Sequence, residues 1–237
     1  MKKKLLVKTL ILSAASITLI NANAATNFYV GGSAGYSALS TPTGPAFTVT
    51  NPGSGSTVYE TASKDDAGGF GSGLFAGYTI NQFWAVELGY TNYADTNYSS
   101  TQSQYNSSTN ANQGTKTASL DYSTYSVDLF FKGTLPLQDK LSAFAKVGVS
   151  YVNQAVDYSN SSNGDPTISI NGDTFATPKI GSNTYTAYRP AGGLGFTYAI
   201  NERFSASLFG QGFIGSGDFE TEQDAIASAY LVGASVI

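Results

Sequence analysis

The stretch that decides the fold is Gly73-Leu74-Phe75-Ala76-Gly77-Tyr78-Thr79-Ile80-Asn81-Gln82-Phe83-Trp84-Ala85-Val86-Glu87-Leu88-Gly89-Tyr90. It divides at a tight turn, Asn81-Gln82, and apolar residues alternate with small or polar ones on both sides of that turn. After the turn, one face of an extended strand carries Trp84, Val86, Leu88 and Tyr90, and the other carries Ala85, Glu87, Gly89 and Thr91. A transmembrane β-strand presents its apolar face to lipid and its small or polar face to the barrel interior. The stretch therefore predicts two membrane-spanning strands.

The same alternation recurs along the chain, beginning with the apolar face Phe28, Val30, Gly32, Ala34 and Tyr36. We expect strands at about 28–37, 70–80, 83–93, 120–135, 141–152, 185–200, 203–214 and 226–237. The fourth should end at Pro136, which cannot donate a ladder hydrogen bond, and Pro190 should interrupt the ladder of the sixth. No segment after the N-terminal one is apolar for 18 residues, which excludes a helical membrane protein.

The connections between these strands alternate strictly in length. Long ones span about 38–67, 94–117, 153–183 and 215–225, whereas the others are a few residues, at 81–82, 136–140 and 201–202. Short periplasmic turns and long extracellular loops are typical of outer-membrane barrels, and the alternative, a soluble β-sandwich, has no reason to sort its loops in this way. The sequence predicts an all-β, eight-stranded antiparallel transmembrane β-barrel.

The long connections are rich in Ser, Thr, Asn and Gly, and residues 94–117 are close to low complexity with little to bury. Two loops have the pattern of a hairpin above the membrane. One would pair 47–50 with 57–61 around Asn51-Pro52-Gly53, and the other would pair 167–170 with 174–177 around Asn171-Gly172. Flexible coil is an equal alternative for each.

The N-terminus has the pattern of an export signal. Lys2, Lys3, Lys4 and Lys8 surround the start of an apolar run, 5–20, which is followed by Asn21-Ala22-Asn23-Ala24. A membrane-anchoring helix is the alternative, but the apolar run is shorter than a spanning helix needs and contains Ser13, Ser16 and Thr18. We expect cleavage after Ala24, so that residues 1–24 are a signal peptide and 25–237 the barrel domain.

Composition excludes several classes of function. The chain has 16 acidic and 12 basic residues, and four of the basic ones lie in the signal, so the mature charge is 8 − 16 = −8, unlike a nucleic-acid-binding protein. Cysteine and histidine are absent, which rules out a disulfide framework, a Cys-ligated zinc and a Ser-His-Asp site. We expect no enzyme activity, no metal site and no cofactor. Asp65-Asp66 and the acidic run 218–224 should be solvated loop surface, with divalent cation capture, including bridging to lipopolysaccharide, as the alternative.

Two groups of side chains are candidates for a role in the barrel. Five charged residues should face the interior, where charges persist only if they are paired or hydrated: Glu87, Asp128, Lys132, Lys146 and Arg189. They should satisfy one another in a water-filled lumen, with a small ion-conducting path as the alternative. Aromatic residues at the ends of the apolar faces should form the membrane-interface belts: Phe28, Tyr36, Tyr78, Trp84, Tyr90, Tyr198 and Tyr230.

The strands also resemble a known family. Residues 73–90 are similar to the second hairpin of the outer membrane protein A transmembrane domain and its opacity-protein relatives. Residues 28–31 resemble the first strand of that family, 132–136 the fourth, and 191–193 with 198–200 the sixth. The resemblance covers the strands and none of the loops. It implies a barrel with a filled interior in the bacterial outer membrane, surrounded by lipid and lipopolysaccharide and inserted by the outer-membrane assembly machinery.

The chain departs from that family in three places. We expect the last strand to be the end of the protein, without the peptidoglycan-binding domain of many relatives, and the final residue is Ile237 instead of an aromatic residue. Glu87 and Lys132 match two members of the family's interior gating cluster, but Thr197 and Ser207 stand where the resemblance places the other acid and base. A partner switch of the family type is therefore not expected.

Nearly half of the mature chain is predicted to be loop, which is more than barrel closure requires. We therefore expect a non-enzymatic surface protein, structural in part, whose loops contact host or other cell-surface molecules, as in adhesion. The alternative is a porin-like channel for small solutes or ions, which rests on the charged lumen alone.

Overall fold

The computed structural model describes residues 27–40, 57–66, 68–106, 112–160, 167–170, 173–176, 180–215 and 226–237. Its elements are β1 (Phe28–Ser40), β2 (Thr57–Asp66), β3 (Gly68–Asn81), β4 (Trp84–Asn92), β5 (Thr96–Asn106), β6 (Asn112–Gln138), β7 (Leu141–Asn160), β8 (Thr167–Ile170), β9 (Asp173–Ala176), β10 (Ile180–Ala199), β11 (Ser205–Phe213) and β12 (Ser228–Val236). Among these described residues, no helix is long and apolar enough to cross a membrane. The predicted signal peptide, 1–24, lies outside them.

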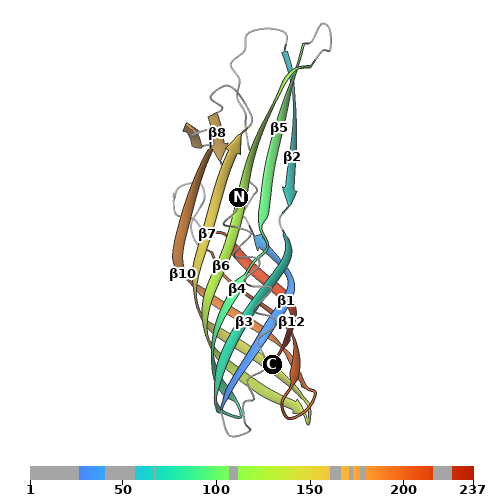
Figure 1. Ribbon diagram of the computed structural model, residues 1–237, viewed down its shortest axis with the longest axis vertical. Helices are drawn as coiled ribbons and strands as arrows, with labels where there is room; N and C mark the ends of the chain where they lie inside the picture. The colour runs from blue at the N-terminus through green and yellow to red at the C-terminus, as the bar shows by residue number, and fades with distance from the viewer. Residues whose placement is uncertain are drawn as a thin grey trace.

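Eight of the strands close into a barrel (Figure 1). Neighbouring strands pair antiparallel in the order β1-β3-β4-β6-β7-β10-β11-β12, and β12 returns to β1 with Gly35 opposite Gly233. Closure gives every strand of the barrel a partner on both sides, so the wall has no open edge inside the membrane. The predicted eight-stranded antiparallel barrel is confirmed.

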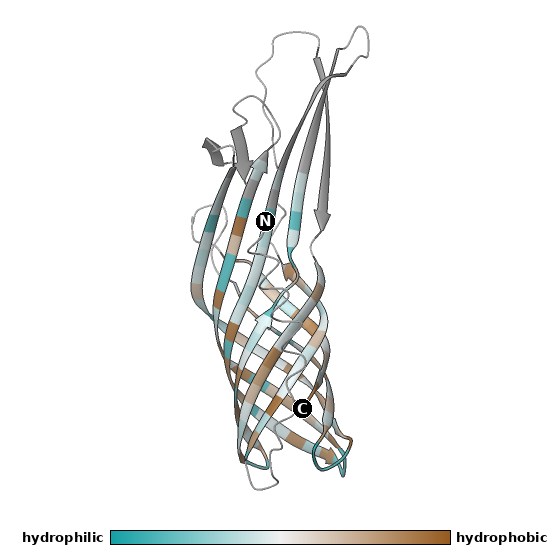
Figure 2. Cartoon of the chain, in the orientation of Figure 1, coloured by the Kyte–Doolittle hydropathy of each residue, from teal (hydrophilic) through white to brown (hydrophobic). Residues whose placement is uncertain are grey.

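Burial alternates along the strands with the period of two that the sequence shows. On β4 the side chains of Ala85, Glu87 and Thr91 are buried, whereas those of Trp84, Val86 and Leu88 are exposed. Large apolar side chains thus lie on the outside of the wall, and Figure 2 shows brown segments along the strands of the barrel. A soluble sandwich would bury these residues, so that alternative is excluded.

Two prolines do not end or interrupt their strands, contrary to prediction. β6 continues past Pro136 to Gln138, and β10 runs through Pro190. The N–H and C=O of a residue in an antiparallel strand point to the same neighbour. Thr134 N donates to Phe83 O (2.7 Å), so Pro136, two residues further on, faces the same side, beyond the end of the β4 ladder. Ile214 N donates to Pro190 O (3.0 Å), so Pro190 faces the side of β11, whose ladder to β10 ends at Phe213. The missing donor therefore costs no ladder hydrogen bond.

The prediction that residues 94–117 form a loop is wrong. β5 occupies 96–106 and pairs with β2 on one side and with the N-terminal half of β6 on the other. Together with the extended halves of β6, β7 and β10, these strands continue the wall as a five-stranded sheet beyond the barrel (Figure 1), which we call the extracellular sheet. β5 consists of Ser, Thr, Asn, Gln and Tyr, so its backbone ladders to β2 and β6 stabilise it, together with the packing of Tyr98 on Tyr122.

The two predicted loop hairpins have different outcomes. β8 pairs with β9, with Ile170 opposite Asp173, which confirms the hairpin around Asn171-Gly172. For the other, residues 47–50 lie outside the described residues, and 57–61 belong to β2, which pairs with β5. Residues 57–61 are therefore extended as predicted, and their pairing with 47–50 stays a prediction because 47–50 lie outside the described residues.

Candidate functional site

Three of the five predicted interior charges meet in the barrel. Glu87 on β4, Lys132 on β6 and Lys146 on β7 are brought together because Lys132 lies opposite Lys146 and one strand from Glu87. Lys132 Nζ lies 2.8 Å from Glu87 Oε1, and Lys146 Nζ lies 3.5 Å from Glu87 Oε2. The Tyr29 hydroxyl donates to Glu87 Oε1 at 2.7 Å. One buried carboxylate thus serves two ammonium groups, each on a separate oxygen.

Aromatic rings surround these lysines. Lys132 Nζ lies 4.6 Å from the centroid of the Phe144 ring, and Lys146 Nζ lies 4.7 Å from that of Phe130. Such cation–π contacts stabilise a desolvated ammonium. The cavity beside the cluster measures about 30 Å³, room for one or two water molecules. The interior is therefore packed with aromatic rings, where the sequence led us to expect a water-filled lumen.

Asp128 belongs to a separate, hydroxyl-based network. Thr91 Oγ1 donates to Asp128 Oδ2 at 2.8 Å, and Ser150 Oγ donates to Asp128 Oδ1. Gln211 Nε2 donates to Thr91 Oγ1 at 3.1 Å, which links β11 across the lumen to β4. Hydroxyl donors compensate the buried carboxylate, which has no salt bridge to the described lysines or arginines, and the network ties four strands together.

The remaining interior positions are Arg189, the fifth predicted charge, and Thr197 and Ser207, which stand where the resemblance places an acid and a base. Arg189 is half-buried, and its Nε has no hydrogen-bond partner in the described part of the chain. Thr197 and Ser207 lie opposite each other on β10 and β11, and their hydroxyls share a hydrogen bond of 2.9 Å. At the two positions where the resemblance places an acid and a base, this chain therefore has a neutral, mutually satisfied pair.

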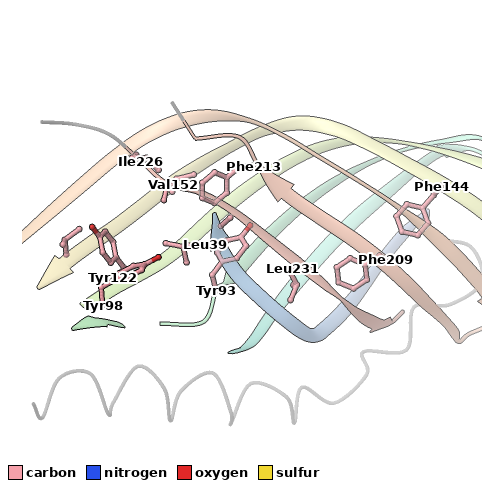
Figure 3. Close-up of a cluster of buried hydrophobic side chains, with 13 residues drawn as sticks. Leu39, Tyr93, Tyr98, Tyr122, Phe144, Val152, Phe209, Phe213, Ile226 and Leu231 are labelled. Atoms are coloured by element: carbon pink, nitrogen blue, oxygen red, sulfur yellow. The ribbon is translucent and has the colours of Figure 1, made fainter. Parts of the chain in front are cut away.

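A second filled layer, which was not predicted from the sequence, closes the lumen toward the extracellular end. Tyr93 and Phe213 pack edge to face at 5.5 Å, and Gln154 Nε2 donates to Thr124 Oγ1 at 2.9 Å. Gln154 Oε1 accepts from the backbone N–H of Ala227 at 3.2 Å, which holds the start of the last strand in the mouth. Figure 3 shows the buried cluster to which Tyr93 and Phe213 belong, and this cluster continues to Phe144 and Phe209 beside the lysines. We call its part around Tyr93 and Phe213, with Leu39, Val152, Ile226 and Leu231, the upper plug.

The predicted interface aromatics all lie on the outer wall, at its two ends. Phe28 packs on Tyr78 at 4.9 Å near the short turns, where Trp84 and Tyr198 also lie. Tyr36, Tyr90 and Tyr230 lie at the opposite end of the apolar band. This second belt also contains residues missing from the prediction, because Tyr90 packs on Tyr125 and Tyr151 packs on Tyr188 across strands. Their outward positions were visible in the alternation, but their pairing depends on strand register.

Among the described strands, the first half of β10 forms one edge of the extracellular sheet, which we call the free edge. Between Ile180 and Arg189 this strand pairs with β7 alone among the described strands, because β11 begins to pair only at Ala191. Pro190 O accepts from Ile214 and Ala199 N donates to Lys140 O, so the backbone groups of even-numbered β10 residues point away from β7. The exposed residues that turn their N–H and C=O to this edge are Ser182, Thr184, Thr186 and Tyr188.

The described residues contain no group of three or more His, Cys, Asp or Glu side chains that could hold a metal ion. The acidic run 218–224 lies outside them, and Asp65-Asp66 belongs to β2. Cation capture by either acidic segment remains an untested alternative from the sequence.

Comparison with known proteins identifies a family model, a relative and solved structures that are similar to this chain. The family model for the OmpA-like transmembrane domain matches residues 23–226. An uncharacterized protein of Coxiella burnetii is 27% identical over 216 residues, which cover 87% of this chain and 84% of that one. The crystal structure of Neisserial surface protein A matches with a TM-score of 0.50 at 16% identity, over 90% of this chain and 97% of that one. Ail, the attachment invasion locus protein of Yersinia pestis, matches with a TM-score of 0.40 at 14% identity, over 90% of this chain and 99% of that one.

Proposed function

The chain belongs to the family of OmpA-like transmembrane domains, and from this premise we propose that it is a surface-interaction protein whose extracellular sheet contacts host or other cell-surface molecules. It is a β-barrel of the bacterial outer membrane. The barrel holds the sheet at a fixed position and orientation, and the contacts belong to the sheet and the loops beside it.

The observation that carries this proposal is the length of the strands beyond the barrel. A tilted strand needs about 9–11 residues to cross the hydrocarbon core. β6 has 27 residues, and β7 and β10 have 20 each. Closure of an eight-stranded barrel requires none of this extra length, nor β2 and β5. The additional backbone pairing builds an ordered surface far from the membrane, as a binding protein requires.

The free edge of β10 gives this surface a means of binding. An exposed sheet edge pairs with an extended segment of a partner through backbone hydrogen bonds, a recurring mode of peptide recognition. The sequence from Gly181 to Tyr188 has no charged residue and no proline, the features that usually prevent edge pairing. The sequence of β2, at the other end of the sheet, includes Glu60, Lys64, Asp65 and Asp66. We therefore place the contact at β10.

The test is adhesion of bacteria that display the chain, measured on cultured epithelial cells and on immobilised matrix proteins. In a truncated variant, a short Gly-Ser turn replaces residues 155–184 and joins Gln154 to Tyr185, which lie opposite each other, so that the outer parts of β7 and β10 are removed with the outer half of the β10 edge. We expect this variant to keep heat-modifiable gel migration, the sign of a folded barrel, and to lose adhesion. Unchanged adhesion by the folded variant would remove the proposal.

The interior does not favour the alternative of a porin-like channel. The charge cluster with its aromatic rings and the upper plug fill the lumen at two levels among the described residues. We also propose that the chain is exported with cleavage after Ala24. N-terminal sequencing of the protein from purified outer membranes tests this, with Ala25 as the expected first residue.

A further inference from the structure

The lipid-facing wall has a hollow on β6 and β7. One row of outward residues crosses four strands, because Trp84 lies opposite Gly133, Gly133 opposite Ala145, and Ala145 opposite Leu194. The two middle residues are among the smallest available, and the two outer ones are large and exposed. The wall is therefore recessed across two adjacent strands.

Larger residues frame this recess along the strands. Toward the turn between β6 and β7, Leu135 lies opposite Ala143, and away from the turn Phe131 lies opposite Val147. Leu135, Phe131 and Val147 are exposed, so their side chains rise at the two ends of the recess. The resulting groove has a volume of about 740 Å³ and an almost entirely apolar lining.

One wall of the groove is fixed in place. The Trp84 indole stacks on the Phe131 ring at 4.9 Å with 19° between the planes, and its Cζ3 atom lies over Gly133. A Cβ atom at position 133 would lie only 2.9 Å from that atom, so glycine permits this indole position. This wall of the groove therefore depends on a specific ring position, which glycine at position 133 permits.

We propose that this groove binds one acyl chain of a phospholipid from the inner leaflet of the outer membrane. Phe83 and Leu135 place the groove beside the short turns, which lie on the periplasmic side. From Ala143 to Val147 the groove extends about 13 Å along β7, within the roughly 15 Å of one leaflet of the hydrocarbon core. Acyl chains are the apolar ligand present at that depth.

A second copy of the chain fits the groove less well. Two identical subunits related by a two-fold axis place the same patch against itself. Two concave surfaces would then face each other and enclose a void, which forfeits the dispersion contacts that packing normally supplies. A single flexible hydrocarbon chain fills such a recess without this cost.

The test uses Trp84, the single tryptophan of the chain, as a reporter inside the site. The folded barrel in detergent micelles is titrated with a phospholipid that carries bromine on its acyl chains, since bromine quenches indole fluorescence on contact. We expect quenching that saturates near one lipid per protein, above a slow linear rise from lipid mixed in the micelle. The Ala145→Leu variant fills the groove and should lose the saturating component.

The matched control is Ala234→Leu, which makes the same change at an exposed, lipid-facing residue of β12 outside the groove, and it should keep the saturating component. Quenching that rises only linearly in the wild-type protein would overturn the proposal, whatever the variants do. Saturating quenching in an Ala145→Leu variant that keeps heat-modifiable migration would also overturn it. A lipid-free dimer, detected by light scattering and dissociated by Ala145→Leu, would show that a second copy of the chain occupies the groove. The groove lies at the opposite end of the molecule from the extracellular sheet, so this result is independent of the adhesion result.

Discussion

Glu87 compensates two buried ammonium groups, so the stability of the barrel depends on this residue more than on either lysine. Removal of one partner from a buried ion pair leaves an uncompensated charge and typically costs about 3–5 kcal/mol. The lysines also contact aromatic rings, which offset part of the loss of the carboxylate. The single acid is therefore the most sensitive member of the cluster.

We predict that Glu87→Gln lowers the temperature at which the folded band converts to the unfolded band on gels. The physical reason is that two ammonium groups remain buried with no anion beside them. The triple variant Glu87→Gln, Lys132→Met, Lys146→Met removes the uncompensated charges and should recover most of the lost stability. Equal conversion temperatures for Glu87→Gln and the wild-type protein would contradict the prediction.

Leu231 and Val232 are adjacent on β12 and face opposite sides of the wall. Leu231 is fully buried in the upper plug, whereas Val232 is exposed on the lipid side. We predict that Leu231→Ala destabilises the folded barrel by about 2–5 kcal/mol, because it opens a cavity in a packed cluster. Val232→Ala, the matched control, should have a much smaller effect in the same urea titration in detergent. Similar losses for both variants would mean that the plug is not tightly packed.

At the scale of elements, β10 serves two different neighbours along its length. Its second half pairs on both sides within the barrel, whereas its first half pairs only with β7 among the described strands. At the free edge, the direction of a residue's backbone N–H therefore decides whether that residue can pair with a partner strand or pairs with β7. The backbone N–H and C=O groups of even-numbered residues there point toward a potential partner, and those of odd-numbered residues point toward β7.

We predict that Thr184→Pro reduces adhesion while the protein remains folded. The substitution removes an edge donor and puts a proline ring where a partner strand would pair, but it leaves the ladder to β7 complete. Asn183→Pro, one residue away, removes a donor that faces β7 and should lower the resistance of the extracellular sheet to protease. Adhesion that is unchanged in Thr184→Pro would show that binding does not use this edge.

At the scale of the whole molecule, side chains of the described residues block the lumen at two levels, which belong to one continuous buried cluster. The lysine and aromatic layer lies around Glu87, and the upper plug lies around Tyr93 and Phe213. We predict that purified wild-type protein gives no sustained open steps in planar-bilayer recordings, because each layer alone excludes a hydrated ion. The variant Tyr93→Ala, Phe213→Ala should stay closed as well, since it opens one layer only. Regular channel steps from the wild-type protein would contradict this and restore the channel alternative.

Much of this organisation is visible in the sequence at the level of single strands. The facing of Glu87, Asp128, Lys132 and Lys146 follows from the period of two, which is a local property of an extended chain. Which acid meets which base does not follow, because it depends on the register between β4, β6 and β7. Asp128 was grouped with the lysines by its facing, but hydroxyls of Thr91 and Ser150 are its partners.

The sequence by itself determined where the eight strands of the barrel wall cross the membrane, which of their faces meet lipid and which the interior, and that the wall closes, because the alternation that specifies a membrane-spanning strand lies within consecutive residues. Only the tertiary structure decided that β2 and β5 join β6, that two prolines lie where a neighbouring strand has ended, and that Trp84, Gly133, Ala145 and Leu194 form one row. Each of these features requires strands that are distant along the chain to be adjacent in a particular register. That register is set by closure of the whole barrel, and no segment of the sequence contains it alone.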